Sequence, residues 1–223
     1  PCLGLPTAWA EEEGGVQWTL DLPDVYAVQR RLASIVRVRV ETMLSAEDPA
    51  TGVQAKLVLV PLGQQAAGSL NADEQLSIAD YFLGGAPGAK RAPSSEIATV
   101  LAGSSARSPN VLSLDLVNGA TKAFTDAKLR DFVQYQYVVE KCTGTLDDGE
   151  CFGSKAKRRN IATATMSSIS QYRTNTERQR MAELGQVREV NVLWLLTLSA
   201  PAAKWDEKTE KDLKSIAATF ALP

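Results

Sequence analysis

The sequence predicts an α+β fold in which helices sandwich a central antiparallel sheet of about six strands. Segments with an apolar–polar period of two predict the strands, and two segments with a helical period, one after the third strand and one at the C-terminus, predict the covering helices. Short connections favour antiparallel neighbours. The length of 223 residues and a hydrophobic fraction of 44% fit one enlarged globular domain.

The first three strands are expected at residues 15–23, 35–43 and Val53–Pro61. In the first of them every second residue is apolar, which is typical of a strand with one buried face. A loop at 45–52 that contains Pro and Gly leads from the second strand to the third. These two strands are therefore expected to pair antiparallel.

One helix is expected over residues 69–83, where the period changes from two to that of a helix. Asn71 and Glu74 have the spacing of a capping box, and a Gly-Gly pair follows the last helical position. The buried face is expected to comprise Leu76, Ala79 and Leu83. Residues 85–110 are rich in Gly, Ala, Ser and Pro, and we expect them to form a surface loop inserted into the domain. The following segment, 111–117, has no clear type.

Three more strands are expected at residues 132–139, 161–169 and 190–198. The last is almost continuously apolar, which predicts a central strand covered on both faces. Pro201 is expected to end it, and Trp205 to pack near the start of a final amphipathic helix. The apolar stripe of that helix is Leu213, Ile216, Ala217 and Phe220.

Composition excludes several kinds of chemistry. The chain has no histidine, so Ser-His-Asp catalysis, Cys-His catalysis and imidazole-based zinc sites are excluded. No nucleotide-binding or nucleophile-elbow motif occurs. The 24 basic and 26 acidic residues give a net charge of −2, which offers no basic field for nucleic acid. These absences weigh against an enzyme, and the expectation that the protein is not an enzyme comes from the family resemblance given below.

The N-terminal residues 1–14 differ from the domain expected at 15–223. Residues 1–10 are small and apolar and close with an A-x-A triplet, which is typical either of the end of an export signal or of a short apolar arm. The acidic run that follows is expected either to meet a basic partner or to be a solvated terminus. It comprises Glu11, Glu12 and Glu13.

Cys142 and Cys151 bracket a turn-rich stretch with an Asp-Gly step. A disulfide between them would stabilise the fold by about 2.5 kcal/mol, and two free thiols are the alternative. The acidic residues Asp147, Asp148 and Glu150 lack the spacing of an EF-hand and are read as a solvated turn rather than a calcium loop. We predict no set of metal ligands in this sequence. If an ion binds, calcium is the candidate.

The densest basic cluster follows at once and comprises Lys155, Lys157, Arg158 and Arg159. Such a cluster in a slightly acidic protein fits a docking surface for an acidic partner, and the alternative is a solvated strand entry. Trp194 and Trp205 are expected in the core rather than in a ligand site.

Four strings resemble the PsbP family of lumenal photosystem proteins, in the same order and over nearly the whole chain from Gly15. Residues 15–23 are similar to the opening G-F-S-F-x-x-P strand, and 69–84 to the first long helix with its closing Y-L-L-G. Residues 161–165 resemble the I-T-A-T strand. Residues 195–201, followed by Trp205 and the helix to Phe220, are similar to the last strand, the Trp-bearing turn and the terminal helix.

The resemblance implies an extrinsic subunit on the lumenal side of photosystem II that helps to retain calcium and chloride and stabilises the oxygen-evolving complex. An assembly factor or a photosystem I subunit of the chloroplast thylakoid lumen is the alternative within the family, and a small-ligand binder or enzyme is the alternative outside it. The expected partners are intrinsic and extrinsic photosystem subunits and, peripherally, the thylakoid membrane surface. The acidic run and the basic cluster are the expected contacts.

Overall fold

The computed structural model describes residues 18–30, 40–63, 70–84, 91–170, 180, 183–184 and 189–222. The strands within them are β1 Ala27–Arg30, β2 Glu41–Asp48, β3 Val53–Pro61, β4 Val111–Leu116, β5 Lys122–Thr125, β6 Asp131–Cys142, β7 Thr145–Asp147, β8 Glu150–Phe152, β9 Lys155–Ser170 and β10 Glu189–Pro201. The helices are α1 Ala72–Leu83, α2 Ser94–Ala106, the short 3-10 helix η1 Ala202–Lys204 and α4 Glu207–Ala218.

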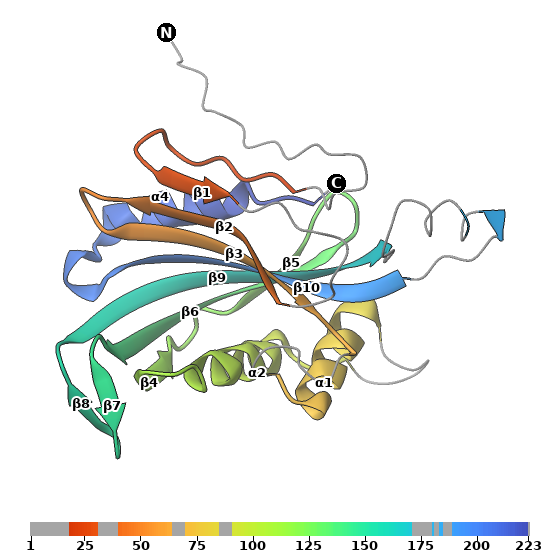
Figure 1. Ribbon diagram of the computed structural model, residues 1–223. Coiled ribbons are helices and arrows are strands. Elements are labelled where there is room, and N and C mark those ends of the chain that lie inside the picture. The colour runs from red at the N-terminus through yellow and green to blue at the C-terminus, as the bar shows by residue number, and fades with distance from the viewer. Residues whose placement is uncertain are drawn as a thin grey trace, which may run out of the picture.

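The α+β prediction is confirmed, with a larger sheet than expected. Eight strands form one antiparallel sheet in the order β1-β2-β3-β10-β9-β6-β4, with β5 paired to β6, and β7 and β8 form a separate pair. Helices α1 and α2 cover one face of the sheet and α4 covers the other (Figure 1). None of the helices in the described residues is both long and apolar enough to cross a membrane.

Strand β10 lies at the centre of the sheet, as its continuous apolar run predicted. It pairs with β3 on one side and β9 on the other, so both of its backbone edges are satisfied. Trp194 and Leu196 are fully buried toward α4, and Leu193 is buried toward α1 and α2. An apolar side chain is therefore favoured at nearly every position of this strand.

Two cores lie on opposite faces of the sheet. The core under α4 takes Leu213, Ile216 and Ala217 from that helix, as the stripe predicted. It also contains Trp18, Leu20 and Leu22, whose alternation predicted a strand. In the structure this N-terminal segment forms isolated bridges at Thr19, which pairs with Ala221, and at Asp21, and not a full strand; the expected residues 15–17 lie outside the described residues.

The capping box of α1 is confirmed, whereas its predicted buried face is wrong at Leu76 and Leu83; Ala79 packs against the core. Asn71 Oδ1 accepts from the Glu74 amide and Glu74 Oε2 accepts from the Asn71 amide, both at 2.9 Å. The buried residues are Gln75, Ile78 and Tyr81, while Leu76 is 62% exposed and Leu83 is 51% exposed. The Gln75 side chain can turn inward because its amide oxygen accepts from the amide of Gly63 and its nitrogen donates to a backbone carbonyl.

The loop predicted at 85–110 is wrong over 94–106, where the chain forms α2. Ile97, Ala98, Leu101 and Ala102 pack on the sheet. Ser104 and Ser105 each donate their hydroxyl to the Leu101 carbonyl, so the helix itself satisfies them. The segment is rich in small and hydroxyl-bearing residues, which is the composition of a loop. The spacing of its buried residues is nevertheless that of a helix. The segment of unclear type at 111–117 forms β4.

Candidate docking surfaces

The basic cluster divides between the two faces of β9. Successive side chains of a strand point to opposite faces, so Lys155, Lys157 and Arg159 share the α4 face and Arg158 lies on the other. The two lysines are exposed and both arginines are partly buried. Lys157 lies opposite Glu140 in the register with β6. The four residues therefore do not form one continuous basic patch.

Arg159 belongs to a polar cluster that joins the sheet to α4. Its Nη2 donates to Gln136 Oε1 at 2.9 Å and lies 3.6 Å from Glu210 Oε2, and its guanidinium lies over the Trp205 ring. Glu210 accepts from Lys214 Nζ at 2.6 Å, from Gln136 Nε2 at 3.0 Å and from Trp205 Nε1 at 3.2 Å. These bonds, that from Lys214 first, lower the pKa of Glu210 to about 2. We call these five residues the Glu210 cluster.

Arg158 holds the turn between β2 and β3. Its Nη2 donates to the Gly52 carbonyl at 2.7 Å and to Ser199 Oγ at 3.0 Å, and burial lowers the pKa of its guanidinium. Lys204 supports the same turn, because its Nζ donates to the Thr51 carbonyl at 3.0 Å. The cation is thus used inside the fold, where charge-assisted bonds to carbonyls fix loop geometry.

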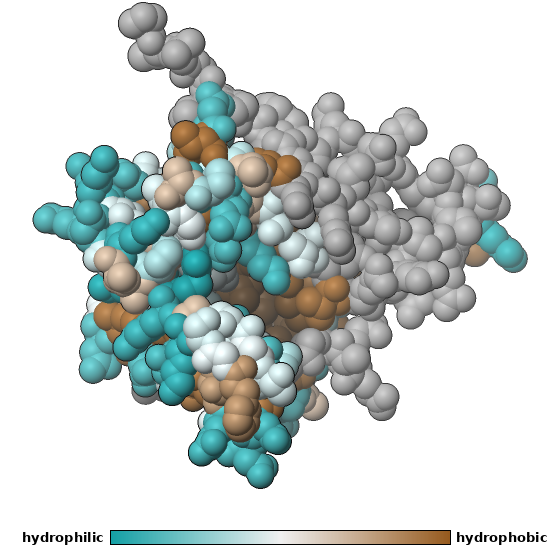
Figure 2. All heavy atoms as spheres, turned by 60° about the vertical axis from the view of Figure 1, so that its left-hand side comes forward, coloured by the Kyte–Doolittle hydropathy of each residue, from teal (hydrophilic) through white to brown (hydrophobic). Residues whose placement is uncertain are grey.

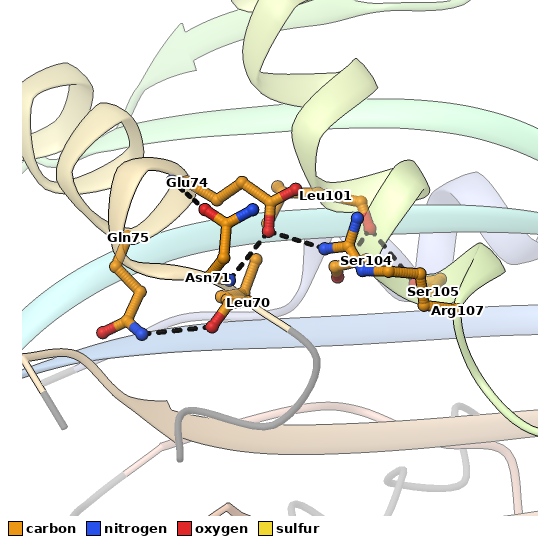
Figure 3. A network of polar contacts seen from close by, with 8 residues as sticks. All are labelled: Leu70, Asn71, Glu74, Gln75, Leu101, Ser104, Ser105 and Arg107. Carbon is orange, nitrogen blue, oxygen red and sulfur yellow. Dashed lines mark hydrogen bonds and ion pairs between the residues drawn. The ribbon is translucent and has the colours of Figure 1, made fainter. Parts of the chain in front are cut away.

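A second polar network, between α1 and α2, is also internal (Figure 3). Glu74, which also forms the capping box of α1, accepts a hydrogen bond from Arg107 Nη2 at 2.6 Å. Burial raises the pKa of Glu74, but the bonds from the Asn71 amide and Arg107 outweigh it, so the pKa is lowered. Gln75 Nε2 donates to the Leu70 carbonyl at 3.1 Å. These contacts fasten the two helices together and leave the charge of Glu74 compensated.

The structure joins Cys142 and Cys151 in a disulfide, with their Cα atoms 5.5 Å apart. Between β6 and β9, residues 143–154 fold back on themselves, and we call them the arm. At its base the Thr143 amide donates to the Ser154 carbonyl at 2.9 Å, and the Thr143 hydroxyl donates to the same carbonyl at 2.8 Å. The arm is thus held at its base by backbone and covalent bonds.

Among the large apolar side chains that the described residues expose, two that sequence reasoning missed lie in turn-rich stretches. Phe152 on β8 is 62% exposed, and Leu129, in the turn between β5 and β6, is 85% exposed with φ 61°. The signal available in the sequence was an apolar residue inside a polar, turn-rich stretch. Such a residue has no local partner to bury it.

The remaining predicted site residues lie elsewhere or are untested. Glu11, Glu12 and Glu13 lie outside the described residues. Within the described part of the chain, no group of three or more Asp, Glu or Cys side chains comes together to hold a metal ion. Trp194 is fully buried, and Trp205 packs against the edge of the same core.

The fold and these surfaces define an α+β protein whose ionic clusters join its own layers and whose projecting arm carries an exposed aromatic ring. No family model matches the chain, and neither does any curated protein. Among solved structures it is similar to cyanobacterial PsbP from Synechocystis sp. PCC 6803, with 10% identity and a TM-score of 0.45 over 95% of each chain. It is also similar to LpqN, a protein involved in cell envelope biogenesis of Mycobacterium tuberculosis. That match has 10% identity and a TM-score of 0.40 over 97% of this chain and 86% of LpqN. At this identity neither match assigns a role to a side chain.

Proposed function

We propose that the chain is a PsbP-like protein that works by docking, as an extrinsic subunit on the lumenal side of photosystem II. In this role it stabilises the oxygen-evolving complex and helps to retain calcium and chloride. It resides in the chloroplast thylakoid lumen, peripheral to the membrane, and touches intrinsic and extrinsic photosystem subunits. It acts through its surfaces and carries out no reaction.

The observation that carries the proposal is the C-terminal unit of the fold. The string at 195–201 forms the end of the central strand β10, and Trp205 lies in the turn that follows. Helix α4 then returns over the sheet, and Phe220, just beyond its end, is buried in the same core. This is the order of strand, Trp-bearing turn and helix that the family resemblance implied. The strings at 69–84 and 161–165 likewise fall on α1 and β9.

The surface chemistry supports docking by charge. Lys155 and Lys157 remain exposed on the α4 face after both neighbouring arginines are used within the fold. Two exposed cations suit an acidic surface of a partner, and such contacts weaken as salt screens them. We leave Arg158 and Arg159 out of this docking surface, because their guanidinium groups already donate to groups within the fold.

The test is rebinding of the full chain to thylakoid membranes of its source organism that have been washed in salt. We expect saturable binding that falls as salt rises, and co-purification with oxygen-evolving photosystem II. The Lys155→Glu/Lys157→Glu variant should bind at least several-fold more weakly. The matched control is Lys208→Glu/Lys211→Glu, which reverses two exposed charges on α4 and should bind like the wild type.

Other outcomes separate the alternatives. Recovery only with photosystem I or with incomplete assemblies would assign the chain to the second role within the family. Binding that survives a high-salt wash unchanged would overturn docking by charge. Failure to associate with any thylakoid complex would overturn the proposed function as a whole.

A further inference from the structure

The arm projects from the ends of β6 and β9 as a two-stranded sheet of its own, away from α1 and α2 (Figure 1). Figure 2 turns this end of the molecule forward and shows hydrophilic side chains beside apolar ones over its lower part. An arm of this kind buries little of its own surface. Because the arm has no hydrophobic core of its own, other features must hold its conformation.

Backbone geometry holds the arm in one shape. A Cβ at Gly144 would lie 2.0 Å from the Phe152 carbonyl oxygen, and one at Gly153 would lie 2.8 Å from the Gly144 Cα. The segment that leads into β7 and the one that leaves β8 thus cross in direct contact where only glycine fits. At the tip, Asp148 and Gly149 have φ of 44° and 81°, as a two-residue hairpin turn of the primed type requires. Together with the disulfide, these features make the arm rigid before it meets any partner.

One face of the arm is chemically distinct. The register places Thr145 opposite Phe152 and Asp147 opposite Glu150, so these four side chains share a face. The other face carries Cys151 and the disulfide to the body of the protein. The first face therefore points away from the attachment and presents an exposed aromatic ring beside two carboxylates.

The carboxylates of the arm are uncompensated within the described residues. Asp147, Asp148 and Glu150 are all exposed, and no ion pair reaches them from the described part of the chain. By contrast, Glu74 and Glu210 are paired inside the fold. Unpaired carboxylates around a ring favour a partner surface with the opposite charge.

We infer that the arm is a docking element that inserts the Phe152 ring into an apolar hollow of a partner protein, with Lys or Arg around the hollow facing Asp147 and Glu150. The inference rests on the proposed function, that the chain works by docking, and names the surface and the chemistry of the partner. A preorganised aromatic anchor loses little conformational entropy when it binds. A membrane is disfavoured, because anionic lipids repel the three carboxylates.

The test places a photo-crosslinking amino acid at position 152 of the full chain in cells of the source organism. The matched control is position 76 on α1, where the side chain is also 62% exposed. We expect a crosslink from 152 and little from 76, to a protein segment that carries Lys or Arg. A crosslink from 152 that does not exceed that from 76, or one to lipid, to an acidic segment or to a second copy of this chain, would overturn the inference.

The identity of the captured protein separates this inference from the proposed function. A basic segment of a photosystem subunit supports both, while a basic segment of an unrelated protein supports the arm and overturns the photosystem role. Affinity for the captured partner gives the second readout. Phe152→Ala and Asp147→Asn/Glu150→Gln should each weaken it about tenfold. Asp115→Asn/Glu189→Gln, which removes two exposed carboxylates elsewhere, should not, and equal affinities for all variants would overturn the inference.

Discussion

The guanidinium of Arg159 lies over the indole ring of Trp205, 4.8 Å from the ring centroid. The strand residue and the turn residue before α4 are thereby held by a cation–π contact as well as through their shared neighbour Glu210. This pair fixes where α4 begins relative to the sheet. It also explains why a cation that the sequence places in a docking cluster serves inside the fold.

Glu210→Gln is expected to lower the free energy of unfolding at neutral pH and to have little effect in acid. The folded carboxyl has a pKa of about 2 against a usual value of 4.5, so its contribution is complete above about pH 4.5 and is lost as the pH falls toward 2. The group is partly exposed, and solvent screening limits the loss to about 1 kcal/mol. Urea unfolding of variant and wild type from pH 6 to pH 2 measures it.

Lys214→Met is a second variant for the same cluster, because Lys214 makes the largest contribution to the low pKa of Glu210. Its difference from the wild type should shrink over the same pH range. A difference that stays constant between pH 6 and pH 2 for both variants would contradict the role given to this carboxylate.

Gly144→Ala should destabilise the arm, whereas Gly103→Ala should stabilise the protein. The first adds a Cβ 2.0 Å from a backbone oxygen and forces the crossing strands apart, at a cost of about 2 kcal/mol. The second adds a Cβ with no atom within 4 Å in the middle of α2, and alanine there gains about 0.5–1 kcal/mol. Chemical denaturation compares the two, and similar shifts for both variants would refute the close crossing.

Removal of the disulfide by Cys142→Ser/Cys151→Ser should cost about 2.5 kcal/mol of unfolding free energy, since the closed loop is short. Both comparisons are made with Cys2→Ser in the background, which prevents exchange with the third cysteine. A reducing agent should then destabilise the protein with the intact pair and leave the variant unchanged. If the reductant shifts both proteins equally, the bridge is not the cause.

Leu129→Asn is expected to stabilise the protein by about 0.5–1 kcal/mol. Leu129 has φ 61°, in the left-handed region that asparagine tolerates better, and at 85% exposure it loses almost no burial on replacement. Leu76→Asn is the control, because that exposed helical position has ordinary backbone geometry and should lose about 0.5 kcal/mol. Thermal melts measure both, and a loss at position 129 would show that the side chain is held by contacts.

The sequence was sufficient for several features that depend on local information. The β-rich apolar run at Val53–Pro61 predicted β3 with its observed bounds, and the Asn71–Glu74 spacing predicted how α1 begins. The stripe of α4 predicted the residues that it buries. These features depend on side-chain period and on hydrogen bonds a few residues apart, which any segment carries with it.

The sequence was misleading where the prediction rested on residue composition and not on the spacing of apolar side chains. The small and hydroxyl-bearing residues of α2 concealed a helix that buries Ile97 and Leu101 against the sheet. The strand predicted from residue 161 begins at Lys155 in the structure, so the alternation across the basic cluster was not expected. Neighbours in sequence, Arg158 and Arg159, consequently point to opposite cores.

By itself the sequence determined the fold class, the central strand and the covering terminal helix, because hydrophobic period and capping are local. Tertiary structure alone decided that Gln75 turns inward while Leu76 stays exposed, that Arg159 meets Glu210, and that Phe152 is left without cover. The physical reason is the same in each case. Whether a charged or aromatic side chain bonds within the fold or stays exposed depends on which strand or helix, distant in sequence, packs against it.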